Sequence, residues 1–139
     1  MRVRDIMTAN ALIIPEGATV AYAAEKMKRH NVGLLAVGDR QNVVGVITDR
    51  DITVRVTAES KDPKHMDVRE VMTPNRVYCF DDQDVEDACF MMLDNHIRRV
   101  LVFDRRRDLV GILSLDDVAM RTRKEKLVGY ALSKVAKAA

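Results

Sequence analysis

Two short motifs carry the side chains best suited to chemistry. Thr48 and Asp51, and later Ser114 and Asp117, each place a hydroxyl three residues before a carboxylate, after an apolar stretch. Such a pair can cap a helix. The hydroxyl accepts a hydrogen bond from a backbone N–H of the first turn, and the partial positive charge at the helix N-terminus stabilises the carboxylate. The carboxylate can also accept two hydrogen bonds from a vicinal diol such as a ribose. From the residues alone, capping is the stronger interpretation, and ligand binding stays open.

The two motifs belong to a longer internal repeat. Residues 3–8 (VRDIMT) return as residues 68–73 (VREVMT), and residues 45–51 (GVITDRD) return as residues 111–117 (GILSLDD). Two similar units can pack face to face, and the seam between them then makes paired, similar sites. The repeat predicts one globule built from two halves.

Each half must supply strands and helices that position its motif. The apolar periodicity predicts a β-α-β-β-α unit, an α/β (α+β) fold whose sheets are covered by helices. Thr19 and Asp84 are the predicted N-caps of the first helix in each half. The other predicted elements are strands over 11–14, 33–37 and 43–47 with a helix from Thr48, and strands over 76–80, 100–103 and 109–113 with a helix from Asp116.

The pattern also predicts the domain limits. Repeat 1 spans residues 1–60, residues 61–67 form the end of the polar linker, and repeat 2 spans residues 68–122. The tail, 123–139, is rich in Ala, Lys and Leu, and we expect a helix whose end is either solvated and frayed or, as the alternative, in contact with a partner.

Composition narrows the function classes. Hydrophobic residues at 47% and charged residues at 32% are typical of a globular chain. A net charge of +2 and only 4% aromatic residues give no support for nucleic-acid binding. The two cysteines and three histidines show no metal spacing, and no phosphate loop or catalytic triad is present, so the sequence predicts no enzyme and no metal site. No apolar run reaches membrane-spanning length, and we expect a cytoplasmic protein.

The two motifs, each behind a Met-Thr opening, resemble a tandem pair of cystathionine-β-synthase (CBS) domains, called a Bateman module. The resemblance runs from Val3 to about Met120. It implies two repeats packed as a pseudo-twofold pair, with two clefts that bind adenosine-containing ligands: AMP, ADP, ATP or S-adenosylmethionine. It also implies a flat homodimer formed through the helices. With the resemblance included, ligand binding becomes the stronger interpretation of the motifs.

The family pattern assigns residues to both clefts. In the better-equipped cleft, Ser114, Asp116 and Asp117 hold ribose, with Ile112 near the base and Thr8, Ile13, Val32, Gly33 and Leu34 opposite. In the second cleft, Thr48, Arg50 and Asp51 lie beside Val46 and opposite Thr73, Tyr78, Ile97 and Arg98. Tyr78 either stacks on adenine or packs as a partly exposed side chain.

The two clefts differ in charge. Arg98 and Arg99 precede a strand at the place where family members often carry a phosphate-binding basic pair, and guanidinium forks suit phosphate oxygens. The equivalent Gly33 and Leu34 offer no charge. The alternative is that the arginines are solvated residues at a helix end. Unlike many relatives, the strand that follows Arg99 contains no proline.

We therefore expect a regulatory, energy-sensing module that needs no cofactor and binds an adenine nucleotide as its ligand. The regulated partner is not encoded in the sequence. Two alternatives remain: a dimerisation or scaffold module with vestigial clefts, and a sensor of S-adenosylmethionine. The two arginines argue mildly against that cationic ligand.

Overall fold

The computed structural model describes residues 1–75 and 77–138. Its contacts group the chain into two compact units: unit 1 is Met1–Ala11 with Val77–Ala139, and unit 2 is Leu12–Arg76. The N-terminal segment therefore packs with the second half of the chain. The sequence predicts a globule of two halves, whereas unit 1 takes segments from both halves of the repeat.

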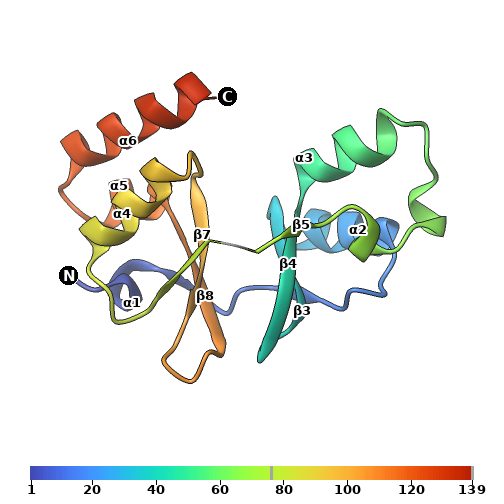
Figure 1. Cartoon of the computed structure of the whole chain (residues 1–139), viewed down its shortest axis with the longest axis horizontal. Helices are drawn as coiled ribbons and strands as arrows, with labels where there is room; N and C mark the ends of the chain where they lie inside the picture. Colours follow the sequence, from blue (N-terminus) through green and yellow to red (C-terminus); the bar gives the residue numbers. More distant parts are fainter. Residues whose placement is uncertain (76, 139) are drawn as a thin grey trace. The chain divides into compact units, whose positions relative to one another are not determined.

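Unit 1 is a mixed sheet with helices on one side (Figure 1). The strand order is β1-β8-β7-β6, with β6 and β7 parallel and the other pairs antiparallel. Its elements are α1 (Val3–Ile6), β1 (Thr8–Ala9), β6 (Tyr78–Phe80), α4 (Val85–Asp94), β7 (Arg99–Phe103), β8 (Leu109–Ser114), α5 (Leu115–Arg121) and α6 (Glu125–Ala138).

Unit 2 repeats this plan in the order β2-β3-β4-β5. Its elements are β2 (Ile13–Ile14), α2 (Val20–His30), β3 (Leu34–Asp39), β4 (Asn42–Thr48), α3 (Asp49–Ile52), the π-helix η1 (Thr53–Thr57), the 3₁₀ turns η2 (Pro63–His65) and η3 (Val68–Glu70), and β5 (Thr73–Pro74). The predicted order of elements is confirmed in both halves. The predicted strand over 76–80 begins at Arg76, which lies outside the described residues.

The caps that start the helices match the sequence prediction. The Thr19 hydroxyl accepts a hydrogen bond from the Tyr22 amide at 3.1 Å, and the Asp84 carboxylate accepts one from the Glu86 amide at 2.8 Å. Each bond satisfies an amide that the helix itself leaves without a partner. The caps thereby fix where α2 and α4 begin.

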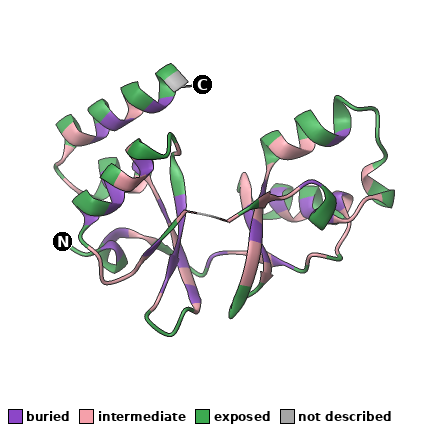
Figure 2. Ribbon diagram, in the orientation of Figure 1, coloured by how far each residue is buried: buried purple, intermediate pink, exposed green. Residues whose placement is uncertain are grey.

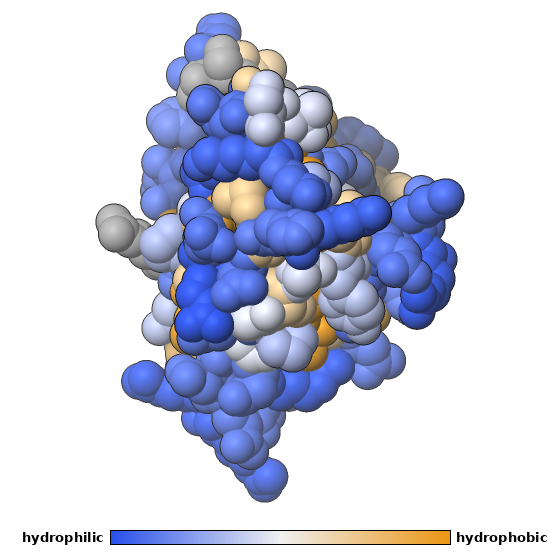
Figure 3. Space-filling view, turned by 90° about the vertical axis from the view of Figure 1, so that its right-hand side faces the viewer, coloured by the Kyte–Doolittle hydropathy of each residue, from blue (hydrophilic) through white to orange (hydrophobic). Residues whose placement is uncertain are grey.

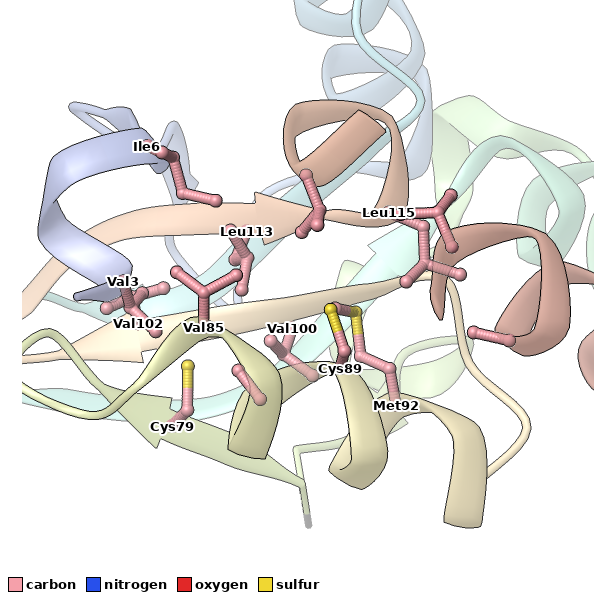
Figure 4. Close-up of a cluster of buried hydrophobic side chains, with 14 residues drawn as sticks. Val3, Ile6, Cys79, Val85, Cys89, Met92, Val100, Val102, Leu113 and Leu115 are labelled. Atoms are coloured by element: carbon pink, nitrogen blue, oxygen red, sulfur yellow. The ribbon is translucent and has the colours of Figure 1, made fainter. Parts of the chain in front are cut away.

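Each unit has its own aliphatic core. In unit 1, Val3 and Ile6 of α1 pack with residues of α4, β7 and β8 (Figure 4), including Val85, Met92 and Leu113. In unit 2, the core consists of buried side chains of β2, α2, β3 and β4, together with three buried valines between residues 56 and 71. These side chains are Ile14, Val20, Ala23, Met27, Leu35, Val37, Ile47, Val56, Val68 and Val71.

The described helices of both units expose large apolar side chains, and those of unit 1 are Phe90 on α4, Met120 on α5 and Tyr130 on α6. Tyr22 on α2 and Val54 on η1 are the exposed ones among the described helices of unit 2. The face of the molecule in Figure 3 is mainly hydrophilic, with only small hydrophobic areas between charged side chains. Among the described residues, no helix is long and apolar enough to cross a membrane.

The C-terminal helix corrects one expectation. Instead of a solvated tail, α6 packs against α4 and α5 and buries Val128, Ala131 and Val135 (Figure 2). These residues recur at helical spacing and form one apolar stripe. The Lys124 ammonium, just before α6, also donates to the Glu86 carboxylate at 2.7 Å. The helix is therefore an integral part of unit 1, and unit 2 has no equivalent of it in its described residues.

Candidate functional site

The hydroxyl–carboxylate motif of unit 1 forms a complete capping box at the start of α5. The Ser114 hydroxyl accepts from the Asp117 amide at 3.0 Å, and Asp117 Oδ2 accepts from the Ser114 amide at 3.0 Å. The Ser114 hydroxyl donates to the same Oδ2 at 3.0 Å. The capping interpretation is thus confirmed as local structure, and it uses only one of the two carboxylate oxygens.

The second oxygen of Asp117 points to the N-terminal segment. The Thr8 hydroxyl donates to Asp117 Oδ1 at 3.3 Å, a long hydrogen bond. Thr8 reaches this position because β1 pairs with β8, which places it directly opposite Ile112. Thr8, Ile112 and Asp117, which the family resemblance assigns to one cleft, therefore meet within unit 1.

The basic pair lines a pocket beside this motif. Arg98, Arg99, Ser114 and Asp116 surround a cavity of about 340 Å³. Arg99 lies opposite Ser114 in the β7–β8 ladder, and the Arg98 carbonyl accepts from the Leu115 amide at 3.0 Å. Within residues 1–75 and 77–138, the side chains of Arg98, Arg99 and Asp116 make no ion pair or side-chain hydrogen bond. The pocket thus presents two exposed guanidinium groups and one exposed carboxylate with unused hydrogen-bonding capacity.

We call the seven residues of this arrangement the unit 1 site: Thr8, Arg98, Arg99, Ile112, Ser114, Asp116 and Asp117. The pocket lined by four of these residues, with a volume of about 340 Å³, lies near the lower end of the range for small-molecule sites, about 300–1,000 Å³. Chemically, it offers paired cations for an anion next to a carboxylate and hydroxyl for a diol.

Unit 2 builds the same framework without the basic pair. The Thr48 hydroxyl accepts from the Asp51 amide at 3.1 Å, and Asp51 Oδ2 accepts from the Thr48 amide at 3.0 Å. Thr73 lies opposite Val46 in the sheet, and its hydroxyl donates to Asp51 Oδ1 at 3.5 Å. Arg50 is exposed at the helix start. We call Val46, Thr48, Arg50, Asp51 and Thr73 the unit 2 set.

Beside the unit 2 set, a carboxylate lies close to the position where unit 1 has a cationic side chain. A Cβ at Gly33, which is equivalent to Arg98, would lie 2.9 Å from Asp49 Oδ2. The equivalent of Asp49 is Leu115, which is buried in the core of unit 1. This difference makes the unit 2 set less suited to a phosphate.

The remaining predicted residues are divided between the units. Unit 2 holds Ile13 on β2, the exposed Val32, Gly33, and Leu34 opposite Thr48. Unit 1 holds the half-buried Ile97 and the more exposed Tyr78. Their contributions to a cleft stay predictions.

Tyr78 belongs to an aromatic cluster on the sheet of unit 1. Its ring meets Phe80 and Phe103 edge-on, with centroid distances of 5.7 and 5.4 Å, and 42% of the residue is exposed. The packed, partly exposed alternative therefore describes its state here, and exposed ring surface remains for a ligand.

Two arginines next to the motifs were not singled out from the sequence. Arg121 donates to the carbonyls of Ile6 and Met7 at 3.0 and 3.2 Å. Arg55 donates to the carbonyls of Val71 and Met72 at 2.7 and 3.3 Å. Both follow the motif aspartate by four residues, so their recurrence within the repeat was the available signal.

Arg105, an exposed residue of the turn between β7 and β8, is paired. Its guanidinium forms a forked ion pair with Asp82, with a shortest distance of 2.8 Å, and lies 4.2 Å from the centre of the Phe80 ring. The hydrogen bond from Arg105 lowers the pKa of Asp82 below its usual value. This pairing occupies Arg105 and distinguishes it from Arg98 and Arg99.

The cysteines are structural. Cys79 and Cys89 are free thiols with no exposed surface, and burial raises their pKa values to about 12 and about 11. Among the described residues, no group of three or more His, Cys, Asp or Glu side chains is placed to hold a metal ion.

Comparison with known proteins identifies the family. Residues 3–57 and 68–123 each match the CBS domain family, so the chain belongs to this family and carries two CBS domains in tandem. The chain is 35% identical over 133 residues to the CBS domain-containing protein YhcV of Bacillus subtilis, and the match covers 96% of this chain and 94% of YhcV.

Solved structures agree with the fold. The CBS domain protein TA0289 of Thermoplasma acidophilum aligns with a TM-score of 0.81 at 28% identity, over 96% of this chain and 75% of that one. The CBS domain pair of protein MJ0100, solved with 5′-methylthioadenosine and S-adenosyl-L-methionine, aligns with a TM-score of 0.76 at 27% identity, over 87% of this chain and 94% of that one. The predicted family and the mixed α/β fold are therefore confirmed.

Proposed function

We propose that this chain is a regulatory, energy-sensing module, not an enzyme, and that its unit 1 site binds an adenine nucleotide: AMP, ADP or ATP. One observation carries the proposal. Arg98 and Arg99 line a pocket of about 340 Å³, next to the Ser114 hydroxyl and the Asp116 carboxylate, and within the described residues neither arginine has a side-chain partner. Unpaired guanidinium groups at a pocket favour an anionic ligand, and adjacent acceptors favour a hydroxyl-rich one.

Each residue of the site has a distinct role. Asp117 Oδ1 and the Asp116 carboxylate accept from the ribose hydroxyls, and Ile112 lies against the base. Arg98 and Arg99 donate to phosphate oxygens through their planar forks. The capping bonds to Asp117 Oδ2 hold the carboxylate in one orientation, so the ligand meets an ordered acceptor.

Unit 2 provides a second set with a weaker preference for phosphate. Its Asp51 and Thr48 repeat the ribose-binding geometry, whereas Gly33 and Asp49 stand where unit 1 has Arg98 and Leu115. The contributions of Ile13, Val32, Gly33 and Leu34 to one cleft, and of Tyr78 and Ile97 to the other, stay predictions. Association of two copies through the helices, the identity of the regulated partner, a cytoplasmic location, and the repeat limits 1–60 and 68–122 with the tail 123–139 stay predictions.

S-adenosylmethionine is the second candidate ligand. It shares adenine and ribose with the nucleotides, and MJ0100, at 27% identity, was solved with this compound and with 5′-methylthioadenosine. The two arginines disfavour its sulfonium charge, whereas Asp116 favours it. The balance between these charges decides which ligand binds.

Calorimetric titration with adenosine, AMP, ADP, ATP and S-adenosylmethionine tests the proposal. Arg98→Ala and Arg99→Ala should each weaken AMP by about tenfold or more, since a hydrogen bond to a charged group contributes about 1.5–3 kcal/mol. Adenosine, which lacks phosphate, should lose little affinity. Arg106→Ala, an exposed arginine in the β7–β8 turn, is the matched control.

Two results would contradict the proposal in different ways. An equal loss of adenosine and AMP affinity in the arginine variants would remove the phosphate role. The absence of heat with every ligand at millimolar concentration would favour the scaffold module with vestigial sites.

A further inference from the structure

The chain passes between the units twice, and each passage follows a two-residue strand that belongs to a candidate site. The first passage follows Ala11, two residues after β1 (Thr8–Ala9), which pairs with β8. The second follows β5 (Thr73–Pro74), which pairs with β4. We call Thr8–Ala11 the first crossing segment and Thr73–Asn75 the second.

An arginine ties each crossing segment to the helix that follows its motif. Arg121, the last residue of α5, donates to the carbonyls of Ile6 and Met7, just before the first segment. Arg55 in η1 donates in the same way to the carbonyls of Val71 and Met72, just before the second. Because charged hydrogen bonds to two successive carbonyls restrict a backbone, each arginine fastens the start of its segment.

The motif aspartate contacts the same segment through a different atom. Asp117 Oδ2 is engaged by Ser114, so Oδ1 has the open acceptor positions, and Oδ1 is where the Thr8 hydroxyl donates. Thr73 makes the equivalent contact with Asp51 Oδ1 at 3.5 Å. A ribose hydroxyl that reaches the open oxygen must therefore share it with, or displace, the threonine.

The arrangement in unit 2 adds two direct contacts of the arginine. Arg55 Nη1 lies 3.3 Å from the Thr73 hydroxyl and 3.7 Å from Asp51 Oδ1, so arginine, threonine and aspartate meet. The structure shows the same three residue types in the same roles in both units. This recurrence indicates a built feature, because a solvated arginine would have no reason to hold the same two carbonyls in each repeat.

We propose that Arg121 and Arg55 are positioning residues that couple occupancy of their neighbouring aspartate to the conformation of the crossing segments. Ligand binding at Asp117 Oδ1 weakens the Thr8 contact, and Arg121 passes the resulting change in α5 to Ile6 and Met7. The first crossing segment is then the output of the unit 1 site. This inference rests on the proposed function and adds to it the route by which occupancy is transmitted.

Hydrogen exchange of the full chain, with AMP as the probe, tests the coupling. AMP at a saturating concentration should change the exchange rates of amides in Thr8–Ala11 by about fivefold, at the low end of typical allosteric coupling. Arg121→Ala should abolish this AMP-induced change, and Arg121→Lys, which keeps donors for the carbonyls, should restore part of it. The readout is the difference that AMP makes, which a purely stabilising role for Arg121 would leave intact.

Further variants separate the coupling from folding effects. Thr8→Val removes the hydroxyl at nearly constant volume and should also lose the AMP-induced change. This variant tests the coupling even if Arg121→Ala fails to fold. Arg123→Ala, an exposed neighbour, should retain it. Arg55→Ala is the equivalent variant in unit 2. It should alter amide exchange in the second crossing segment, Thr73–Asn75, and leave the AMP-induced change in the first segment intact.

The outcomes distinguish the two proposals. If no adenosine ligand binds, the proposed function fails and the coupling fails with it. If AMP binds with the expected dependence on Arg98 and Arg99 but Thr8–Ala11 does not respond, or responds equally in Arg121→Ala, only the coupling is wrong.

Discussion

At the scale of single residues, the two oxygens of Asp117 have different environments. Oδ2 completes the capping box with Ser114, whereas Oδ1 accepts the long hydrogen bond from Thr8. Capping and ligand binding therefore do not compete for the same atom. The residue can start a helix and still present an acceptor to a diol, so the two interpretations of the motif are compatible.

Asp117→Asn should separate these two roles. The amide oxygen can still accept from the Ser114 amide, so we expect a loss of stability of about 1 kcal/mol or less. The acceptor offered to the ribose becomes an NH₂ donor, so AMP affinity should fall by about tenfold or more. Urea unfolding and calorimetry measure the two effects. Asp51→Asn in unit 2 is the matched control, and equal losses of AMP affinity in both variants would deny the preference for unit 1.

The buried thiols predict a pH effect on stability. Unfolded thiols ionise with a pKa near 9.0, whereas the pKa values of Cys79 and Cys89 in the fold are about 12 and about 11. Between pH 9 and about 11 the unfolded state therefore loses protons that the native state keeps, and the free energy of unfolding falls as pH rises. Cys79→Ala with Cys89→Ala should show a smaller fall over this range in urea unfolding. Identical pH profiles of the two proteins would contradict the burial of the thiols.

At the scale of elements, the short strand β1 depends on a glycine in β8. A Cβ at Gly111 would lie 2.7 Å from the Thr8 carbonyl oxygen and 2.8 Å from the Met7 sulfur. The equivalent Gly45 has the same relation to the Thr73 carbonyl oxygen, at 2.7 Å. Only the absence of a side chain lets the Met-Thr segment approach this closely.

Gly111→Ala should therefore destabilise unit 1. Overpacking of a closely packed site costs about 1–3 kcal/mol, and we expect a loss in this range together with faster amide exchange in Thr8–Ala9. Gly129→Ala in α6 is the control, because a Cβ at Gly129 would meet no described atom within 4 Å. That variant should gain up to about 1 kcal/mol through helix propensity. A neutral Gly111→Ala would mean that β1 is not held against β8.

The helix α6 contributes a buried stripe to unit 1. Val128→Asp would place an unpaired carboxylate in a position that is 4% exposed, and burial of a charge without a partner is strongly unfavourable. We expect α6 to detach, with faster exchange over Glu125–Ala138 and a reactive Cys89 thiol. Ser133→Asp, on the exposed face of the same helix, should change neither. Retained protection of Cys89 in Val128→Asp would show that α6 does not cover it.

At the scale of the whole molecule, the sequence predicts the elements better than their grouping. Apolar periodicity and the caps at Thr19 and Asp84 locate the main helices and strands. The two-residue strands β1 and β5 have no periodicity of their own, and their pairing depends on Gly111 and Gly45. The repeat shows which segments are equivalent, but equivalence does not say which copy of the sheet each Met-Thr segment joins.

The residues of the candidate site could likewise be predicted only in part from the sequence. Residue types show that Ser114 and Asp117 can cap a helix or bind a diol, whereas the assignment of Arg98 and Arg99 to phosphate follows from the family resemblance and stays a prediction. Arg55 and Arg121 resemble ordinary solvated helix residues in the sequence. Their recurrence four residues after each motif aspartate marks them as equivalent, but only the structure shows their contacts with backbone carbonyls. The burial of α6 was accessible in principle, since Val128, Ala131 and Val135 recur at helical spacing.

The grouping of Met1–Ala11 with Val77–Ala139 can be tested with one pair of equivalent substitutions. Val3 and Val68 occupy the same place in the two repeats and are both fully buried, but Val3 lies in the core of unit 1 and Val68 in the core of unit 2. An aspartate at either position leaves a charge without a partner in an apolar core, so the unit that contains it should lose stability. Val3→Asp should therefore speed amide exchange over residues 77–138 and spare residues 12–75, although it lies in the first half of the chain. Val68→Asp should do the reverse, and because the two variants introduce the same group at equivalent positions, each is the control for the other. If Val3→Asp instead weakened residues 12–75, the N-terminal segment would pack with its own repeat, and Thr8 could not then be the partner of Asp117.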